Sequence, residues 1–154
     1  MFDIFKKKKE IVAPLSGESV PLEKVPDEAF SQKMIGDGIS IIPSDGHLVS
    51  LFDGMVVRVF DTKHAYVLKS DDGIEVLIHI GIDTVKLNGE GFDNRVSNGQ
   101  KVKKGDLLSI IDFDFISKQG LPIFTPVIFT NMDQFNMKFN FGSLTRGETP
   151  ISYY

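Results

Sequence analysis

The chain has 154 residues, of which 42% are hydrophobic and 25% charged, a composition that suits one globular domain with a sizeable core. A formal net charge of −4 disfavours nucleic acid as a partner, and the absence of cysteine excludes thiol chemistry, disulfides and cysteine-ligated metals. Because a chain without cysteine is consistent with a reducing compartment, we expect a cytoplasmic protein.

The N-terminus is basic, with four lysines at positions 6 to 9. No apolar stretch follows that is long enough for a signal peptide or a membrane span. We therefore expect a flexible basic segment over residues 1–10, with at most weak contact to a membrane surface, ahead of one domain over residues 11–154.

The rest of the chain consists of short apolar runs rich in β-branched and aromatic residues, separated by turns that 14 glycines and seven prolines supply. This pattern predicts an all-β fold, an antiparallel β-sandwich of many short strands resembling a Greek key or jelly roll. Helical periodicity is weak and predicts at most short turns over residues 25–31 and 113–119, the second stopped by Gly120. The apolar runs, in chain order, cover residues 10–14, 39–43, 54–60, 64–69, 74–80, 106–112, 122–130 and 150–154.

Two of the three histidines, His64 and His79, flank the strong turn signal Ser70-Asp-Asp-Gly73 and are expected on the two strands of one hairpin. In an even-numbered loop His64 lies opposite His79, with Cβ atoms about 5 Å apart. The core face would then carry the more apolar set, and the other face the histidines. The predicted core set is Ala65, Val67, Val76, Ile78 and Ile80, and the predicted outer set is Thr62, His64, Tyr66, Leu77 and His79.

A bulge at Gly73 is the alternative, because Asp-Asp-Gly also suits a type I turn followed by a glycine bulge. It shifts the pairing by one residue and puts the two rings on opposite faces. A functional pair then requires a compensating irregularity, and the turn residues do not decide between these registers.

Two neighbouring imidazoles have three interpretations. In the first, each histidine is a structural side chain that is partly buried and makes its hydrogen bonds within the protein. In the second, the pair binds a metal ion, and in the third, one histidine is a nucleophile. A catalytic zinc site is short of ligands, since only His47 and Asp83 remain as candidates, although His64 and His79 could bind zinc together with a ligand from a partner.

A neutral imidazole is a competent nucleophile towards phosphorus, and a second imidazole can donate an N–H to the phosphoryl oxygens. No nucleotide-binding loop is present, so the phosphoryl group should come from one protein and leave to another, with no cofactor.

The order and spacing of motifs from about Ile11 to Ile151 resemble the glucose-type IIA domain of the bacterial phosphoenolpyruvate:sugar phosphotransferase system. The stretch His79-Ile-Gly-Ile-Asp-Thr, with a second histidine one hairpin earlier, is the most specific. The other motifs are Ala13-Pro-Leu-Ser-Gly17, Gly36-Asp-Gly38, Asp53-Gly54, Thr62-Lys-His-Ala65, Leu87-Asn-Gly-Glu-Gly-Phe92, Gly99-Gln-Lys-Val-Lys-Lys-Gly-Asp106, Thr125-Pro-Val127, Thr130-Asn-Met132 and Gly147-Glu-Thr-Pro150.

The resemblance implies a phosphotransferase component that works through phosphohistidine. His79 would accept the phosphoryl group on Nε2, and His64 would stabilise it and be needed for onward donation. Thr62 would orient His64, and the carbonyl of Gly81 would hold Nδ1–H of His79. The donor would be the histidine-containing phosphocarrier protein, and the acceptor a cysteine on the IIB domain of a sugar permease.

A partner-binding surface is expected around the pair, because acidic residues suit a basic partner rim and apolar residues would seat two partners in turn. We expect a monomer. The predicted surface consists of Asp27, Phe30, Ile35, Phe60, Leu77, Ile80 and Asp83.

A biotinyl or lipoyl carrier is a further alternative beside the zinc hydrolase, because residues 96–108 resemble a hairpin of such domains. A carrier needs an exposed lysine at a hairpin tip, and Met137-Lys138-Phe139 is the nearest candidate.

Overall fold

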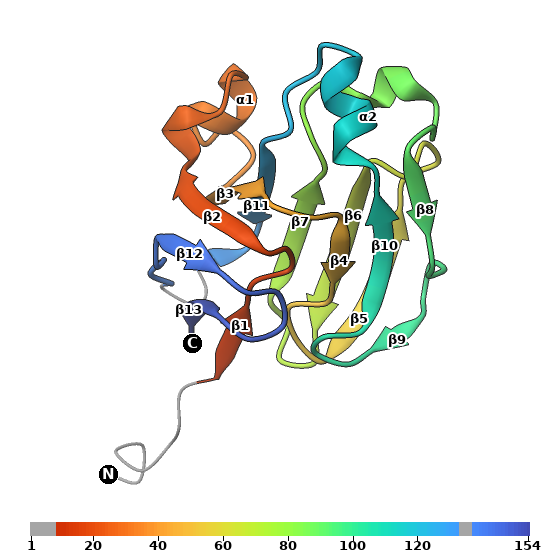
Figure 1. Cartoon of the computed structure of the whole chain (residues 1–154). Coiled ribbons are helices and arrows are strands. Elements are labelled where there is room, and N and C mark those ends of the chain that lie inside the picture. Colours follow the sequence, from red (N-terminus) through yellow and green to blue (C-terminus); the bar gives the residue numbers. More distant parts are fainter. Residues whose placement is uncertain (1–8, 133–136) are drawn as a thin grey trace, which may run out of the picture.

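The computed structural model describes residues 9–132 and 137–154, so the segment predicted over residues 1–10 lies outside the described part except for its last two residues. Regular structure is almost entirely β (Figure 1), and the expected all-β class is confirmed. The strands are β1 (Glu10–Val12), β2 (Gly17–Pro21), β3 (Asp37–Pro43), β4 (His47–Val49), β5 (Gly54–Val59), β6 (Ala65–Ser70), β7 (Glu75–His79), β8 (Phe92–Asn94), β9 (Lys101–Val102), β10 (Leu107–Ile111), β11 (Thr125–Phe129), β12 (Gly142–Leu144) and β13 (Pro150–Tyr153). The helical turns are η2 (Leu22–Lys24), α1 (Glu28–Ser31), η3 (Thr84–Leu87) and α2 (Phe113–Lys118).

Two antiparallel sheets form the sandwich. The larger has the strand order β12-β2-β3-β11-β7-β6-β5-β9 and the smaller the order β4-β10-β8. Figure 1 shows the smaller sheet in front of β5, β6 and β7. Alternate residues of each strand point between the sheets, and their fully buried side chains, such as Ile78 of β7 and Leu108 of β10, form the main core.

The hairpin of β6 and β7 takes the bulged form of its turn. Gly73 has a φ of 95°, and its N–H donates to the carbonyl of Ser70 at 2.9 Å. As a result Ala65, rather than His64, lies opposite His79. The even-loop pairing of the two histidines is therefore wrong, because the glycine takes one additional loop position and shifts the strand by one residue.

This shift reverses the predicted faces of β6 and leaves those of β7 as expected. Tyr66, predicted to point outward, is fully buried in the main core, whereas Val67, predicted as core, is half-buried on the outer face. In β7 the side chains of Val76 and Ile78 are in the core, and Leu77 lies on the outer face.

A second, smaller core covers part of the outer face of the larger sheet. The short helix α1 closes over it, with the carboxylate of its N-cap Asp27 accepting a hydrogen bond from the N–H of Ala29 at 2.9 Å. Both helical turns expected from the sequence are present, and Gly120 follows the second with a φ of 78°. The second core consists of Leu22, Val25, Phe30, Ile82 and Ile128, with Leu77 and Phe124 packed against it.

The first and last described strands pair with each other. Lys9 and Tyr154 exchange two backbone hydrogen bonds of 2.9 and 3.0 Å next to the β1–β13 pair. In Figure 1 these ends lie at the opposite end of the molecule from the C-terminal end of β7. In the described ranges no helix has the length and apolar character needed to cross a membrane.

Candidate phosphotransfer site

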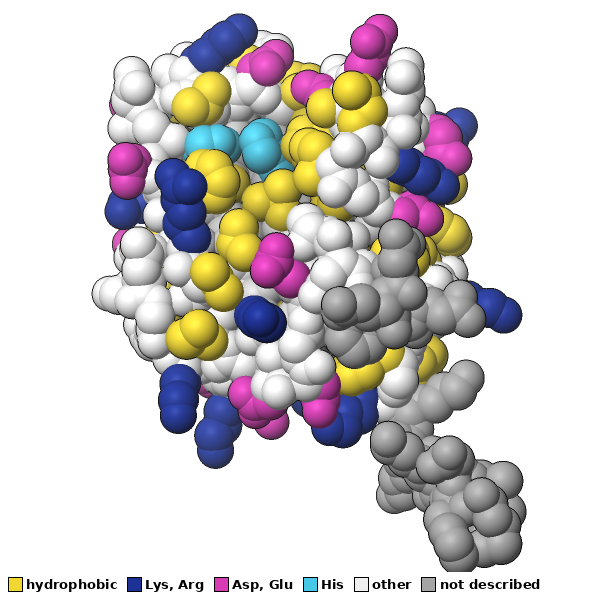
Figure 2. Space-filling view, turned by 180° about the vertical axis from the view of Figure 1, so that it is seen from behind, with side chains coloured by type: hydrophobic (Ala, Val, Ile, Leu, Met, Phe, Trp, Pro, Cys, Tyr) yellow, Lys and Arg dark blue, Asp and Glu magenta, His cyan; other side chains and the backbone are white. Residues whose placement is uncertain are grey.

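His64 and His79 lie side by side on the outer face of the larger sheet. Their ring centroids are 5.1 Å apart and their planes are inclined by 82°. His79 is the last residue of β7 and is half-buried, and His64 directly precedes β6 and is 6% exposed. Figure 2 shows histidine surface enclosed by hydrophobic side chains on this face.

The approach of the two rings does not follow from strand pairing, since Ala65 occupies the position opposite His79. His64 is the final residue of the loop between β5 and β6, and its carbonyl accepts a hydrogen bond of 2.7 Å from the N–H of Ile80. Lys63, directly before it, has a left-handed conformation with a φ of 61°. The regular alternation of faces therefore ends at Ala65, and the ring of His64 turns to the outer face.

The orientation of His79 is set by a backbone carbonyl. Its Nδ1 lies 2.8 Å from the carbonyl oxygen of Gly81. A carbonyl can only accept, so Nδ1 carries the proton and Nε2 of the neutral ring keeps a lone pair. Gly81 has a φ of 72°, and a Cβ there would lie 2.5 Å from Cγ2 of Thr84, so this turn needs glycine.

The orientation of His64 is set by a hydroxyl group. Oγ1 of Thr62 lies 2.6 Å from Nδ1 of His64. A threonine hydroxyl can donate or accept, and with Thr62 donating the imidazole carries its proton on Nε2. In that tautomer the ring can donate a hydrogen bond to an anionic oxygen.

Both imidazoles are held neutral at pH 7. Burial, and secondarily the positive charge that His79 would carry, lower the pKa of His64 to about 4. Burial also lowers the pKa of His79, while the Gly81 carbonyl and the carboxylates of Asp27 and Asp83 act in the opposite direction. A neutral ring is the form in which histidine acts as a nucleophile.

Two phenylalanines extend the pair into a row of four rings. The ring of Phe30 is 5.1 Å from that of His79, and the ring of Phe60 is 5.6 Å from that of His64, edge to face. The guanidinium carbon of Arg58 lies 4.4 Å from the centroid of Phe60. Both phenylalanines expected near the pair therefore contact it directly.

Ile80, also expected in the apolar surface, is fully buried in the main core. It follows His79 in the alternation of β7 and so points to the opposite face of the sheet. The apolar surface expected around the histidines therefore cannot include Ile80.

Phe30, at 5% exposed, belongs to the second core and not to the open surface, whereas the other expected residues reach it. Leu77 is half-buried on the outer face, and Ile35 is 41% exposed. Asp27 is half-buried and Asp83 exposed, and both carboxylates are close enough to His79 to influence its pKa.

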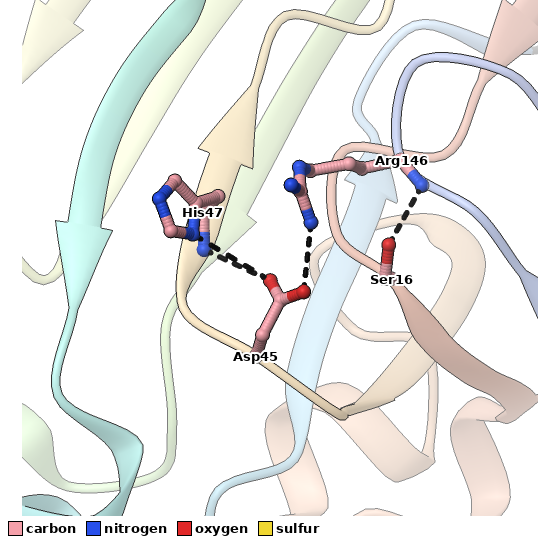
Figure 3. A network of polar contacts seen from close by, with 4 residues as sticks. All are labelled: Ser16, Asp45, His47 and Arg146. Carbon is pink, nitrogen blue, oxygen red and sulfur yellow. Dashed lines mark hydrogen bonds and ion pairs between the residues drawn. The ribbon is translucent and has the colours of Figure 1, made fainter.

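The third histidine belongs to a separate network on the smaller sheet (Figure 3). His47, in β4, is 3.9 Å from the carboxylate of Asp45, which also accepts a 2.7 Å hydrogen bond from Arg146. The backbone N–H of Arg146 donates to the hydroxyl of Ser16 at 3.0 Å. Among residues 9–132 and 137–154, no group of three histidine, aspartate or glutamate side chains is arranged to hold a metal.

The lysine considered for a biotinyl or lipoyl carrier does not stand at a hairpin tip. Phe139 stacks on Phe129 at 5.5 Å and forms a β-bridge with Ser152, and Met137 is buried. Lys138 is exposed between two anchored residues, in contrast to the free tip that a carrier needs.

Two features of the site were not predicted, the ring contact of Arg58 and the backbone conformation of Lys63. Arg58 stands two positions before Phe60, and an i, i+2 spacing in a strand is the signal that would have suggested their stacking. For Lys63 the sequence suggests a positive charge beside His64 that could tune partner choice, but it gives no signal of the left-handed backbone, because asparagine and glycine, not lysine, are the residues expected there.

The fold and the site together define a phosphotransfer domain, a small antiparallel β-sandwich that presents two neutral imidazoles on one face. Comparison with known proteins agrees. Residues 9–135 match the family model of the phosphoenolpyruvate-dependent sugar phosphotransferase system, EIIA 1. The glucose permease IIA from Mycoplasma capricolum superimposes with a TM-score of 0.90 over 97% of both chains at 35% sequence identity.

Two relatives show this domain in different settings. The glucose-specific EIIA component of the phosphotransferase system of Buchnera aphidicola is 44% identical over 151 residues, which are 97% of this chain and 94% of that protein. The glucose-specific EIICBA component of Staphylococcus saprophyticus is 53% identical over 123 residues, which are 80% of this chain. This chain spans 18% of the length of the Staphylococcus protein.

The chain belongs to the EIIA 1 family of the phosphoenolpyruvate-dependent sugar phosphotransferase system, which confirms the family inferred from the motifs. As a member it is a phosphotransferase component that carries a phosphoryl group from the histidine-containing phosphocarrier protein to a IIB domain.

Proposed function

We propose that His79 accepts the phosphoryl group on Nε2 and that His64 assists its departure. The observation that carries this proposal is the pair of perpendicular rings 5.1 Å apart, each held at Nδ1 by a different oxygen. The lone pair on Nε2 of His79 attacks phosphorus as the P–N bond of the donor's phosphohistidine breaks, and the donor imidazole keeps the electron pair. In the onward step a cysteine thiolate of the IIB domain attacks phosphorus, and the electron pair returns to Nε2.

His64 supplies a hydrogen-bond donor to the phosphoryl oxygens. Phosphoryl transfer depends mainly on positioning and on electrostatic stabilisation of the equatorial oxygens, and an oriented N–H donor contributes to both. Thr62 keeps this proton on Nε2 of His64, and the carbonyl of Gly81 keeps the lone pair on Nε2 of His79.

Both partners dock over the histidine pair in this proposal. Phe60 and Leu77, with Ile35 at the edge, form the accessible apolar part of the surface, and the buried Phe30 packs beneath it against His79. A dry surface of this kind slows hydrolysis of the phosphohistidine. Asp27 and Asp83 give one rim the negative charge that suits a basic partner.

The cellular setting is proposed from the relatives. Both curated relatives are named as glucose-specific components, so we assign glucose uptake to this chain. The domain over residues 11–154 acts as a monomer in the cytoplasm and meets the membrane permease transiently, with weak surface contact through the basic N-terminus.

A phosphorylation assay tests the proposal. The chain is incubated with phosphoenolpyruvate, enzyme I and the histidine-containing phosphocarrier protein, and acid-labile, alkali-stable phosphate is measured on wild type, His79→Ala and His64→Gln. We expect label on wild type and His64→Gln and none on His79→Ala.

Transfer onward to a IIB domain then separates the two histidines. Phosphorylated His64→Gln should donate at least tenfold more slowly than wild type, because it lacks the N–H donor beside the phosphoryl group. Phosphate on His79→Ala at the wild-type level would contradict the role of His79 as acceptor. An unchanged rate of donation by His64→Gln would contradict the role of His64.

A further inference from the structure

The contact between His64 and His79 exists despite the strand register. In that register the pairing places Ala65 opposite His79. Regular alternation would send the side chain of His64 towards the core face, where Tyr66 and Ile80 are fully buried. An irregularity before Ala65 must therefore direct the ring to the outer face.

Lys63 is that irregularity. Its φ of 61° is in the left-handed region, which costs energy for any residue with a Cβ and is tolerated best by glycine, asparagine and aspartate. The conformation is fixed by the surrounding turn, because the N–H of Lys63 donates to the carbonyl of Phe60 at 2.7 Å and the N–H of Phe60 donates to the carbonyl of Ala65 at 3.0 Å. Strained backbone of this kind persists where the surrounding structure imposes it, often beside a functional site.

The ammonium group of Lys63 has no comparable role in the site. Among the ion pairs between described residues, none involves Lys63. Within the described residues, the contacts that tie Lys63 to the loop of His64 are therefore those of its backbone.

We infer that Lys63 is a positioning residue for phosphoryl transfer, whose left-handed backbone, rather than its charge, turns His64 towards His79. The effect on transfer rests on the proposed function of the two histidines, whereas the effect on the position of His64 does not. The inference predicts which side chains the position accepts. Glycine and asparagine should keep the pair intact, and a β-branched residue should separate it.

The test compares Lys63→Val, Lys63→Gly and Lys63→Asn with a matched control. Lys33 has a φ of 57°, so Lys33→Val places the same side chain in the same backbone conformation away from the β5–β6 loop. Each folded variant is measured in two ways: the imidazole pKa of His64 by NMR titration, and kcat and KM for transfer to a IIB domain.

For Lys63→Val we expect the His64 pKa to rise from about 4 towards the unperturbed value of about 6.5, because the ring leaves its buried position. Onward transfer should slow roughly 10- to 100-fold, mainly in kcat, because displacing a catalytic group by about 1 Å reduces enzymatic rates by up to about this much. The rate at which His79 accepts the phosphoryl group from the donor should change less, because the carbonyl of Gly81 holds that ring. Lys63→Gly, Lys63→Asn and Lys33→Val should keep the wild-type pKa of His64 and the wild-type rate.

Two results would overturn the inference. One is a wild-type pKa of His64 and wild-type transfer in Lys63→Val. The other is a loss of transfer in Lys63→Gly and Lys63→Asn equal to that in Lys63→Val, which would assign the role to the ammonium group. If Lys63→Val does not fold, Lys63→Ala with its smaller strain takes its place with the same expected direction. If wild type accepts no phosphoryl group, the proposed function fails while the titration of His64 still decides the positioning.

Discussion

Each imidazole of the site is oriented by one oxygen atom, and the kind of oxygen decides what the ring can do. The carbonyl of Gly81 can only accept, so it leaves Nε2 of His79 with a lone pair. The hydroxyl of Thr62 can donate as well as accept, so it permits the tautomer in which Nε2 of His64 carries the proton. One ring is thereby suited to attack phosphorus and its neighbour to stabilise the oxygens around it.

Burial of His64 makes stability depend on pH. Its pKa is about 4 in the folded protein and about 6.5 when unfolded, so the folded state binds fewer protons in this range. The stabilisation is complete above pH 6.5 and is lost as the pH falls from 6.5 to 4. We expect a loss on the order of 2 kcal/mol from this ring, measured by urea denaturation at several pH values.

Replacing His64 with glutamine should flatten that dependence, because the side chain no longer titrates. The lowered pKa of His79 adds to the loss in the same direction, so His79→Gln should flatten part of the remainder. An unchanged slope between pH 6.5 and 4 in His64→Gln would contradict the prediction.

At the scale of single residues, the hydrogen-bond partners of the two rings could be predicted from the sequence, whereas the backbone conformation that orients His64 could not. The contacts of Thr62 with His64 and of Gly81 with His79 agree with what the family resemblance implied. The left-handed turn at Lys63 was not predictable, because it is imposed by the loop hydrogen bonds and not favoured by a lysine side chain.

At the scale of elements, the β6–β7 hairpin shows where sequence patterns end. Its existence and the faces of β7 follow from the alternation of apolar residues, but the turn residues fit two registers equally well. One residue of difference decides whether Tyr66 is core or surface. The choice depends on packing of Tyr66 and Leu68 against the opposite sheet, which no local pattern contains.

The central strands also require glycine for close approach. A Cβ on Gly38, in β3, would lie 1.9 Å from the carbonyl oxygen of Val127 in β11, and a backbone atom cannot move aside as a flexible side chain can. We expect Gly38→Ala to destabilise the fold by about 3 kcal/mol, measured by urea denaturation.

Gly99 is the matched control for that substitution. It has a φ of 83°, and a Cβ added there would meet no atom within 4 Å, so Gly99→Ala carries conformational strain without a clash. Its cost should be about 1 kcal/mol. Equal losses in the two variants would show that the close approach of β3 and β11 is not what demands glycine at position 38.

For the whole molecule, we expect the placement of charge to affect partner binding more than the net value of −4 does. Asp27 caps α1 by accepting a hydrogen bond from the N–H of Ala29, and Asp83 has a left-handed φ of 61°. Asparagine is uncharged but can also cap a helix and adopt a left-handed conformation. The double variant Asp27→Asn/Asp83→Asn should keep its fold and lower kcat/KM for phosphorylation by the donor roughly tenfold at low salt, with a weaker salt dependence. Initial rates across a salt series measure both effects.

The control removes two other exposed carboxylates. Glu10, in β1, and Glu148, in the turn before β13, belong to the end of the molecule that carries the termini. Glu10→Gln/Glu148→Gln changes the net charge by the same amount and should leave the donor step within about twofold of wild type. An equal loss in both double variants would point to net charge and away from the rim beside His79.

The pairing of the first and last described strands, β1 and β13, bears on how such a domain can be joined to others. Since Lys9 and Tyr154 are hydrogen-bonded neighbours, a chain that continues from either residue leaves the sandwich at nearly the same point, at the opposite end of the molecule from the tip of β7. The effective concentration of the site at a tethered partner then depends on the length of the linker and hardly on the order of the domains. The same sandwich can thus be placed before or after its neighbours, provided that the linker is long enough to bring the histidine face round to them.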